Sequence, residues 1–438
     1  MEIDTGDTAW ILVASALVLL MTPGLAFFYG GLGRTKSVLN MMMMSFVSIG
    51  VVTILWLLYG YSLAFGPDVG SGLLGNLDKI GLRGTLDQAS GTLPELTFAS
   101  FQVMFAIITV ALISGAIADR AKFGGWVLFS ILWATVVYFP VAHWVFFFDD
   151  GNGGWIADRL GALDFAGGTA VHINAGAAAL ALTFVLGRRL NWPKDPGRPH
   201  NVPFVLLGAA LLWFGWFGFN AGSAVAANGL SAIAFMNTQV ATAAAAIAWI
   251  GVEKLRNGHA TAVGFASGAV AGLVAITPSC AAVNPMGALV VGLVAGGACA
   301  FAVSFKYRLG YDDSLDVVGV HLVGGVVGSL IIGLLATATV TGGAEGLFYG
   351  GGLELLGKQA IAVVAVGGYS FVLTLVLGFL VDKTIGFRIS RDDELQGVDE
   401  TTHAETAYDT SGLGGGGGGG GGVFAGPSGS TVKEGVSA

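Results

Sequence analysis

Long apolar runs separated by short polar breaks dominate this chain. Each run is close to the length of about 20 residues that a helix needs to cross the hydrocarbon core of a bilayer. The runs occupy residues 8–32, 38–65, 97–118, 123–147, 166–187, 202–226, 231–252, 260–278, 285–306, 317–340 and 357–382. The pattern predicts an all-α polytopic membrane protein with eleven transmembrane helices.

The composition agrees with a membrane protein. Only 11% of the residues are charged and 54% are hydrophobic, whereas soluble domains carry about 25% charged residues. The net charge of -8 identifies no partner, because most of the acidic excess lies in loops and in the tail. Cys280 and Cys299 have neither the number nor the spacing of a disulfide framework or a metal site. We therefore expect small buried thiols, no metal and no cofactor.

The distribution of Lys and Arg predicts the orientation. Of the 20 basic residues, 16 fall in alternate connections or in the tail, and the other side keeps only Lys79, Arg83, Arg159 and Lys358. The positive-inside rule then places the N-terminus outside and the C-terminus in the cytoplasm. Acidic residues stand where a secretory signal would be basic, so residues 8–32 are predicted to be a genuine span.

Two histidines lie inside apolar, glycine-rich spans, His172 in the fifth and His321 in the tenth. An ionisable group within the membrane is costly unless it faces a cavity or a partner, so each marks a candidate site. Their places suggest that helices 1–5 and 6–10 form two inverted five-helix repeats, followed by a final helix. An acidic residue precedes each histidine, Asp164 by eight positions and Asp316 by five.

Aromatic rings gather in two of the predicted helices. Residues 213–223 read WFGWFGFNAGS, and Phe105 lies in another span. Such rings are commonly core or lipid-facing surface, and that alternative stays open. Beside two intramembrane histidines, however, rings can offer a cation their π faces, for about 0.5–2 kcal/mol each. The pattern then indicates a small cation that is recognised and stripped of water.

The segments that carry this chemistry resemble the ammonium transporters of the Amt/Mep/Rh superfamily, and the resemblance covers residues 8–409. It is carried by MTPGLAFFYGGL (21–32), FAIITVALISGAIADR (105–120), GALDFAGGTAVHINAG (161–176), WFGFNAGS (216–223), ITPSCA (276–281), DVVGVHLVGG (316–325) and GFRISRDDELQGVDETTHAETAYD (386–409). The histidine and tail motifs resemble the Amt branch. The resemblance implies a homotrimer in the cell membrane, with one pore in each subunit.

The resemblance also implies roles along the pore. Phe105 and Phe219 resemble the paired rings that close its outer end. His172 and His321 resemble twin histidines whose imidazoles share a proton along the pore.

Other matched positions concern the outer site and the pore wall. Ser223 resembles the hydroxyl of the external ammonium site, and Trp216 and Thr277 resemble pore-lining groups. Asp164 matches an acidic residue near the external site, but its position at the start of the fifth helix makes a helix N-cap the competing interpretation.

One position departs from the Amt branch. Members of the branch commonly carry Trp three residues after the histidine of the fourth helix, where this chain has Phe146. Phe keeps a π face, but a weaker one than Trp. Trp144 and Trp155 are alternative sources of that ring, and the acidic pair at 149–150 is expected to alter the vestibule.

Energies favour crossing as ammonia. Moving a bare ion into hydrocarbon-like surroundings costs of order 20 kcal/mol, and a few π faces do not offset that cost. Burial lowers the pKa of an amine by up to about 3–5 units, so loss of a proton near the twin histidines is the cheaper route. Potassium has no proton to lose. We therefore expect ammonium to be deprotonated and to pass as ammonia, with or without its proton following.

An ammonium sensor or transceptor with little net flux is the alternative function, although no appended signalling domain is visible in the sequence. An enzyme is not expected, because His172 and His321 lack the clustered carboxylate or cysteine ligands of a hydrolytic metal site. The expected partners are ammonium, with methylammonium as its analogue, and the lipid bilayer. No nucleic-acid partner is expected.

The chain is predicted to divide into three parts. Residues 1–385 form the transmembrane transporter domain. Residues 386–409 form an ordered cytoplasmic segment, which in the resembled family contacts neighbouring subunits and takes part in regulation by PII-type proteins. Residues 410–438, with nine consecutive glycines, have the composition of a disordered linker.

Overall fold

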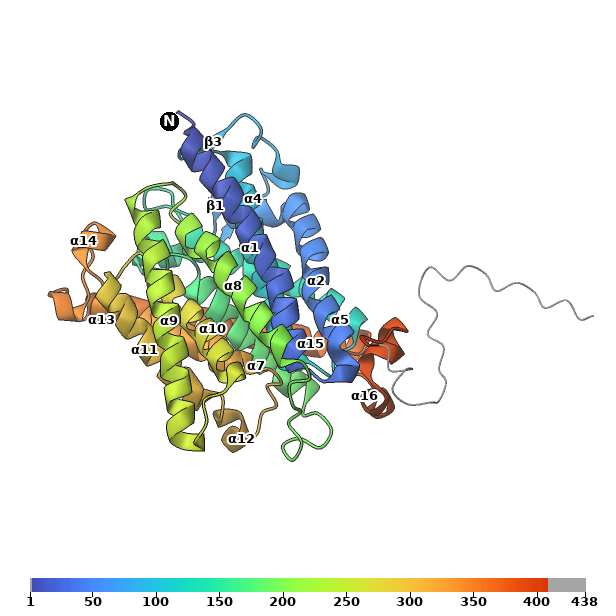
Figure 1. Cartoon of the computed structure of the whole chain (residues 1–438). Helices are drawn as coiled ribbons and strands as arrows, with labels where there is room; N and C mark the ends of the chain where they lie inside the picture. The colour runs from blue at the N-terminus through green and yellow to red at the C-terminus, as the bar shows by residue number, and fades with distance from the viewer. Residues whose placement is uncertain (1, 409–438) are drawn as a thin grey trace, which may run out of the picture.

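The computed structural model describes residues 2–408 (Figure 1). Within them, eleven helical spans are long and apolar enough to cross a membrane: Thr5–Leu32, Thr35–Phe65, Glu95–Ile117, Phe123–Phe146, Gly168–Leu186, Val202–Gly222, Gly229–Asn257, Ala262–Ser279, Pro285–Leu309, Val318–Leu335 and Glu354–Thr384. The predicted all-α architecture with eleven spans is confirmed. The glycine-rich segment 410–438, predicted to be disordered, lies outside the described residues.

Six spans are single or nearly single α-helices. Each of the other five joins α-helical segments to 3-10 or π-helical ones. The single helices are α1 (Thr5–Leu32), α8 (Val202–Gly222), α9 (Gly229–Asn257), α10 (Ala262–Ser279), α11 (Pro285–Ala302, extended by α12, Phe305–Leu309) and α15 (Glu354–Thr384). The composite spans are η1 (Thr35–Ser37) with α2 (Val38–Leu55), η2 (Trp56–Gly60) and α3 (Tyr61–Phe65); α4 (Glu95–Ile113) with η4 (Ser114–Ile117); α5 (Phe123–Trp133) with η5 (Ala134–Tyr138) and α6 (Phe139–Phe146); η7 (Gly168–Ile173) with α7 (Asn174–Leu186); and η8 (Val318–Leu322) with α13 (Val323–Leu335).

The connections contain only short elements. Two antiparallel strand pairs, β1 with β2 and β3 with β4, belong to the link between the second and third spans. The short elements are β1 (Asp68–Val69), β2 (Leu74–Gly75), η3 (Ile80–Leu82), β3 (Ala89–Ser90), β4 (Leu93–Pro94), η6 (Trp155–Leu160), α14 (Ala338–Thr341), η9 (Leu347–Tyr349), α16 (Arg391–Gln396) and η10 (Asp399–His403).

Two predicted boundaries differ from the structure by five residues, and the others differ by less. The seventh span, predicted over 231–252, runs to Asn257, because α9 continues past the apolar run until Gly258, whose φ of 81° ends it. The tenth span, predicted over 317–340, ends at Leu335. There the backbone leaves the helix, and the amide of Thr337 donates to the carbonyl of Ala282 instead. Hydropathy did not detect either boundary, because it does not register these backbone contacts.

The first helices of the two halves run antiparallel and lie side by side (Figure 1). Near the start of α1, the carboxylate of Asp7 accepts from the amide of Ala227, just beyond the end of α8. At the other end, the carbonyl of Gly31 accepts from the amide of Asn201, just before α8 begins. The second half therefore enters the fold with the opposite orientation, as an inverted repeat requires.

The histidine-bearing helices cross in a reciprocal way. A Cβ on Gly176, four residues after His172, would lie 2.5 Å from the backbone nitrogen of Leu322. A Cβ on Gly325, four residues after His321, would lie 2.9 Å from Cγ1 of Ile173. Each half thus supplies a glycine at the same spacing, and each glycine lets the other helix approach closely. These two glycines bring the first turns of both helices together.

A buried ionic cluster lies at the end of the fold opposite the N-terminus. Arg189, just after α7, donates to Asp312 at 2.8 Å and to Asp119 at 3.1 Å. Burial alone would raise the pKa of Asp312, but its hydrogen bonds with Arg189 and the charges of Arg120 and Arg189 outweigh burial and lower that pKa. The cluster therefore joins the ends of the third and fifth spans to the connection before the tenth.

The C-terminal segment packs against the same end (Figure 1). The Glu394 carboxylate accepts from Arg388 at 2.8 Å and from the amide of Leu190 at 2.6 Å. The Asp399 carboxylate accepts from the amides of Leu39 and Asn40 at the start of α2. These bonds hold residues 386–408 against the spans.

The glycine crossing can be tested by stability. We expect Gly176→Ala to lower the midpoint of thermal unfolding in detergent, because overpacking costs about 1–3 kcal/mol. Gly368→Ala is the matched control: it lies on α15 with open space around the added methyl group, and loss of a helical glycine stabilises by about 0.5–1 kcal/mol. Equal midpoints for the two variants would contradict a tight crossing.

Candidate functional site

The two histidines meet in the interior of the fold. His172 and His321 are both buried, and their Nδ1 atoms lie 3.3 Å apart with ring centroids at 5.4 Å. One Nδ1 must carry the proton and the other must accept it, so the two rings share a single proton in this contact. Within residues 2–408, Nε2 of His172 has no hydrogen-bond partner. The pair therefore keeps Nε2 of His172 free to act on a third group.

Carboxylates cap the starts of both histidine helices. Asp164 accepts from the amides of Gly167 at 2.9 Å, Gly168 at 2.6 Å and Thr169 at 2.7 Å. Removal from water raises the pKa of Asp164, and these hydrogen bonds oppose the rise. Asp164 thus caps the free amides at the start of η7, as the competing interpretation expected, although the N-cap position itself is occupied by Gly167. A role of Asp164 in the external ammonium site stays a prediction.

The equivalent carboxylate in the second half is Asp313, not Asp316. Asp313 precedes His321 by eight positions, as Asp164 precedes His172, and it accepts from the amides of Val317 at 3.1 Å and Val318 at 2.8 Å. Asp316 instead pairs with Lys306 at 2.7 Å. The equal spacing of eight residues was the signal in the sequence. The choice of Asp316 as the acidic residue that corresponds to Asp164 was wrong.

A stack of rings leads outward from the histidines. The ring of His172 lies 5.3 Å from that of Trp216 and 6.1 Å from that of Phe219, in near-parallel orientations. Phe219 contacts Phe105 at a centroid distance of 4.3 Å. The indole N–H of Trp216 donates to Thr277 Oγ1 at 2.8 Å. The only polar atom of that indole is therefore engaged, and the stack offers π faces but no free donor.

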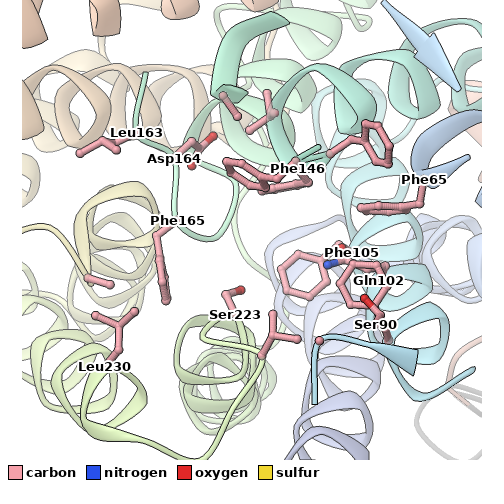
Figure 2. Close-up of a pocket in the computed structure, with 18 of the residues that line it drawn as sticks. Phe65, Ser90, Gln102, Phe105, Phe146, Leu163, Asp164, Phe165, Ser223 and Leu230 are labelled. Atoms are coloured by element: carbon pink, nitrogen blue, oxygen red, sulfur yellow. The ribbon is translucent and has the colours of Figure 1, made fainter. Parts of the chain in front are cut away.

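An outer cavity of about 700 Å³ lies at the end of this stack, near the N-terminus. The lining residues labelled in Figure 2 are Phe65, Ser90, Gln102, Phe105, Phe146, Leu163, Asp164, Phe165, Ser223 and Leu230. Phe105 belongs both to this lining and to the series of rings, so the contacting rings of Phe105 and Phe219, tilted by 40° to one another, lie between the cavity and the histidines. The hydroxyl of Ser223 donates to the carbonyl of Phe219 at 2.8 Å, which leaves its lone pairs available.

The fourth span supplies Phe146 to the cavity, and Phe147 and Phe148, which follow the span, also line it. Phe146 lines the cavity between Asp164 and Phe65 (Figure 2). Trp144 is buried, its indole N–H donates to the carbonyl of Leu73 at 2.8 Å, and its ring packs on Trp155. Neither Trp lines the cavity. The acidic pair belongs to a loop in which Asp158 accepts from the amides of residues 149, 151 and 153.

The structure brings together the nine predicted site residues, in two groups. The cavity holds Phe105, Phe146, Asp164 and Ser223, and the path behind it holds His172, Trp216, Phe219, Thr277 and His321. Sequence reasoning missed Asp313, which precedes His321 by the same eight positions as Asp164 precedes His172.

Comparisons with known proteins agree with this architecture. The model of the Ammonium Transporter Family matches residues 9–408. The ammonium transporter of Mycobacterium tuberculosis (strain ATCC 25618 / H37Rv) is 59% identical over 433 residues, covering 93% of this chain and 91% of that protein. The ammonium transporter of Bacillus subtilis (strain 168) is 46% identical, covering 93% of this chain and 99% of that protein.

Solved structures show the same fold. The crystal structure of Candida albicans Mep2 has a TM-score of 0.83 at 37% identity, covering 90% of this chain and 88% of that chain. A structure described as a sensor Amt protein has a TM-score of 0.82 at 28% identity, covering 90% of this chain and 98% of that chain. The family match over nearly the whole chain and the high identity to named relatives agree: this chain belongs to the ammonium transporter family.

Proposed function

We propose that this protein takes up ammonium at its outer cavity, deprotonates it, and passes ammonia through an apolar pore lined by His172 and His321. The observation that carries the proposal is the unbroken series of ring contacts from the cavity wall at Phe105, through Phe219, to the histidine pair. Residues 1–385 would form the transport domain, and residues 386–409 its cytoplasmic segment.

The chemistry of the path favours a neutral species. Behind Phe105 an ion meets ring faces and the Trp216 indole, whose N–H is already bound to Thr277. Such faces contribute about 0.5–2 kcal/mol each, against a desolvation cost of order 20 kcal/mol for a bare ion. Ammonium reduces that cost by releasing a proton, whereas potassium has none to release. Selectivity then follows from acid–base chemistry rather than from size.

The outer cavity supplies the groups that a waiting cation needs. Phe146 and Phe105 offer π faces. Ser223 Oγ keeps free lone pairs, because its hydroxyl donates a hydrogen bond to the carbonyl of Phe219. Asp164 would act indirectly, by holding the start of the fifth span in place. The external ammonium site is thus proposed to consist of Ser223, Phe146 and Phe105.

The histidine pair is proposed to handle the proton and the ammonia. Its Nδ1 contact holds one proton between the rings, and the free Nε2 of His172 can hydrogen-bond ammonia. Two outcomes are compatible with this arrangement: the proton returns outside, or it follows the ammonia through the pair.

We also propose the cellular setting. The protein lies in the cell membrane as a homotrimer, with its cytoplasmic end open to a PII-type regulatory protein, as the family resemblance implies. The ionic cluster and the C-terminal segment share one end of the fold, and the cavity lies at the other. With most basic residues at the former end, that end is proposed to be cytoplasmic.

A sensor with little net flux is the second candidate, because a protein described as a sensor Amt protein has the same fold. The relatives with higher identity are named ammonium transporters, which favours transport. Binding of ammonium by the purified protein without any uptake into vesicles would favour the sensor.

The orientation predicts where reporters fused to the termini are active. A reporter fused after Lys383 should work only in the cytoplasm, and one fused before Thr8 only outside. Both fusions active on one side would contradict an odd number of spans.

The histidine pair predicts the effect of removing both imidazoles. His172→Ala combined with His321→Ala should reduce ammonium uptake into vesicles to the level of empty vesicles, because no titratable group remains in the pore. His259→Ala, at an exposed position outside the pore, is the matched control and should transport like the parent. The double variant should keep the size of the parent in gel filtration. Ammonium transport by the double variant at the parental rate, with potassium still excluded, would contradict the deprotonation mechanism.

Phe146 predicts a graded change in affinity. Phe146→Trp should lower the half-saturating ammonium concentration by at most roughly fivefold, because Trp has the strongest cation–π face, worth up to about 1 kcal/mol more. Phe146→Leu should raise that concentration and leave the maximal rate nearly unchanged. Phe184→Leu, on the exposed surface of α7, is the control. If both Phe146 variants match the parent, this ring is vestibule packing only.

A further inference from the structure

One polar side chain of the outer cavity has no assigned role. Gln102 is only 9% exposed and lines the cavity from α4. Within residues 2–408, its amide forms no hydrogen bond with another protein group, and its polar atoms are not among those sealed off from open space. The cavity is the space that this amide faces, so an occupant of the cavity is the partner still available to it.

The other deep polar groups of the cavity are already committed. Asp164 is used as a helix cap. The buried Glu95 carboxylate accepts from the hydroxyl of Tyr61 at 2.7 Å and pairs with Lys79. The hydroxyl of Ser223 donates its hydrogen bond to the carbonyl of Phe219. Gln102 differs from these three groups, because both ends of its amide are free of hydrogen bonds to the described residues.

Gln102 lies close to Phe105, one of the two rings between the cavity and the histidines. It precedes Phe105 by three residues on α4, and residues at this spacing share a helix face. Because α4 begins at Glu95, Gln102 lies one turn further from the histidines than Phe105. Figure 2 shows Gln102 beside Phe105 on one wall of the cavity, with Phe165 and Leu230 across from them. A cation resting on the Phe105 ring is thus within reach of this amide.

We propose that Gln102 is a specificity-determining residue of the external site: its Oε1 accepts an N–H of ammonium held over Phe105. The inference rests on the proposed transport function and adds a residue to the same site. Ammonium directs four N–H donors tetrahedrally, whereas potassium has none, and π faces do not distinguish the two by direction. Carbonyl Oε1 and the lone pairs of Ser223 give two directed acceptors, and the Nε2 donor end of the amide must turn away from the cation.

Two substitutions separate this role from packing. Gln102→Met keeps the length and removes the acceptor, so the half-saturating ammonium concentration should rise about tenfold, as expected for the loss of a hydrogen bond to a charged group. The maximal rate should stay close to that of the parent, because these two rings and the histidines are untouched. Gln102→Glu should lower the half-saturating concentration, and added salt should weaken that gain. Gln88→Met, at the exposed rim of the cavity, is the matched control and should change neither value.

Each protein is measured in two ways: uptake into vesicles, and the rise in unfolding midpoint of the purified protein with ammonium chloride relative to sodium chloride. Parental values for both Gln102 variants in both measurements overturn the inference. If Gln102→Met fails to fold, the Glu variant decides, and an unchanged value for it overturns the inference as well. A parent that binds but does not transport overturns the transport proposal alone, and the binding measurement still tests Gln102. A parent that neither binds nor transports overturns both.

Discussion

The fold depends on satisfying two helix starts inside the membrane. The fifth and tenth spans enter from opposite faces, yet the histidines of their first turns touch through Nδ1 at 3.3 Å. Both starts must therefore lie in the interior, where free backbone amides have no water to bind. Asp164 and Asp313 supply the acceptors, each eight residues before its histidine. Without these caps, neither histidine would be held at the crossing, and the path from the cavity would have no titratable group at its end.

The polar groups of the path are arranged so that an ion and its neutral form meet different surroundings. The cavity in front of Phe105 offers oxygen acceptors and π faces, whereas the segment behind it offers rings and two imidazoles. At the far end of the protein, Arg189 and Asp312 form a buried ion pair. This pair joins the end of the fifth span to the connection that precedes the tenth span. Charge is thus kept at the two ends and excluded from the middle, which is the distribution that favours passage of a neutral molecule.

Much of the fold and part of the site can be predicted from the sequence. Hydropathy located all eleven spans, because a membrane helix must be apolar along its whole length, and the cost of a buried imidazole identified His172 and His321. The equal spacing of eight residues pointed to Asp313, but the sequence did not show its role, since that depends on which carboxylate reaches the free amides and which reaches Lys306. Likewise, the sequence left Phe146 and Trp144 as alternatives. Only the hydrogen bond from Trp144 to Leu73 shows that the indole is turned away from the cavity.

The central claim is that the path passes ammonia derived from ammonium and excludes metal cations of similar size. The most direct measurement is a comparison of fluxes into vesicles that contain only this protein, under equal inward gradients of ammonium and of potassium, with empty vesicles as the background. The account predicts ammonium uptake well above that background and potassium uptake that is indistinguishable from it. Potassium entry at a rate comparable to that of ammonium, or no ammonium entry above background, would contradict the account.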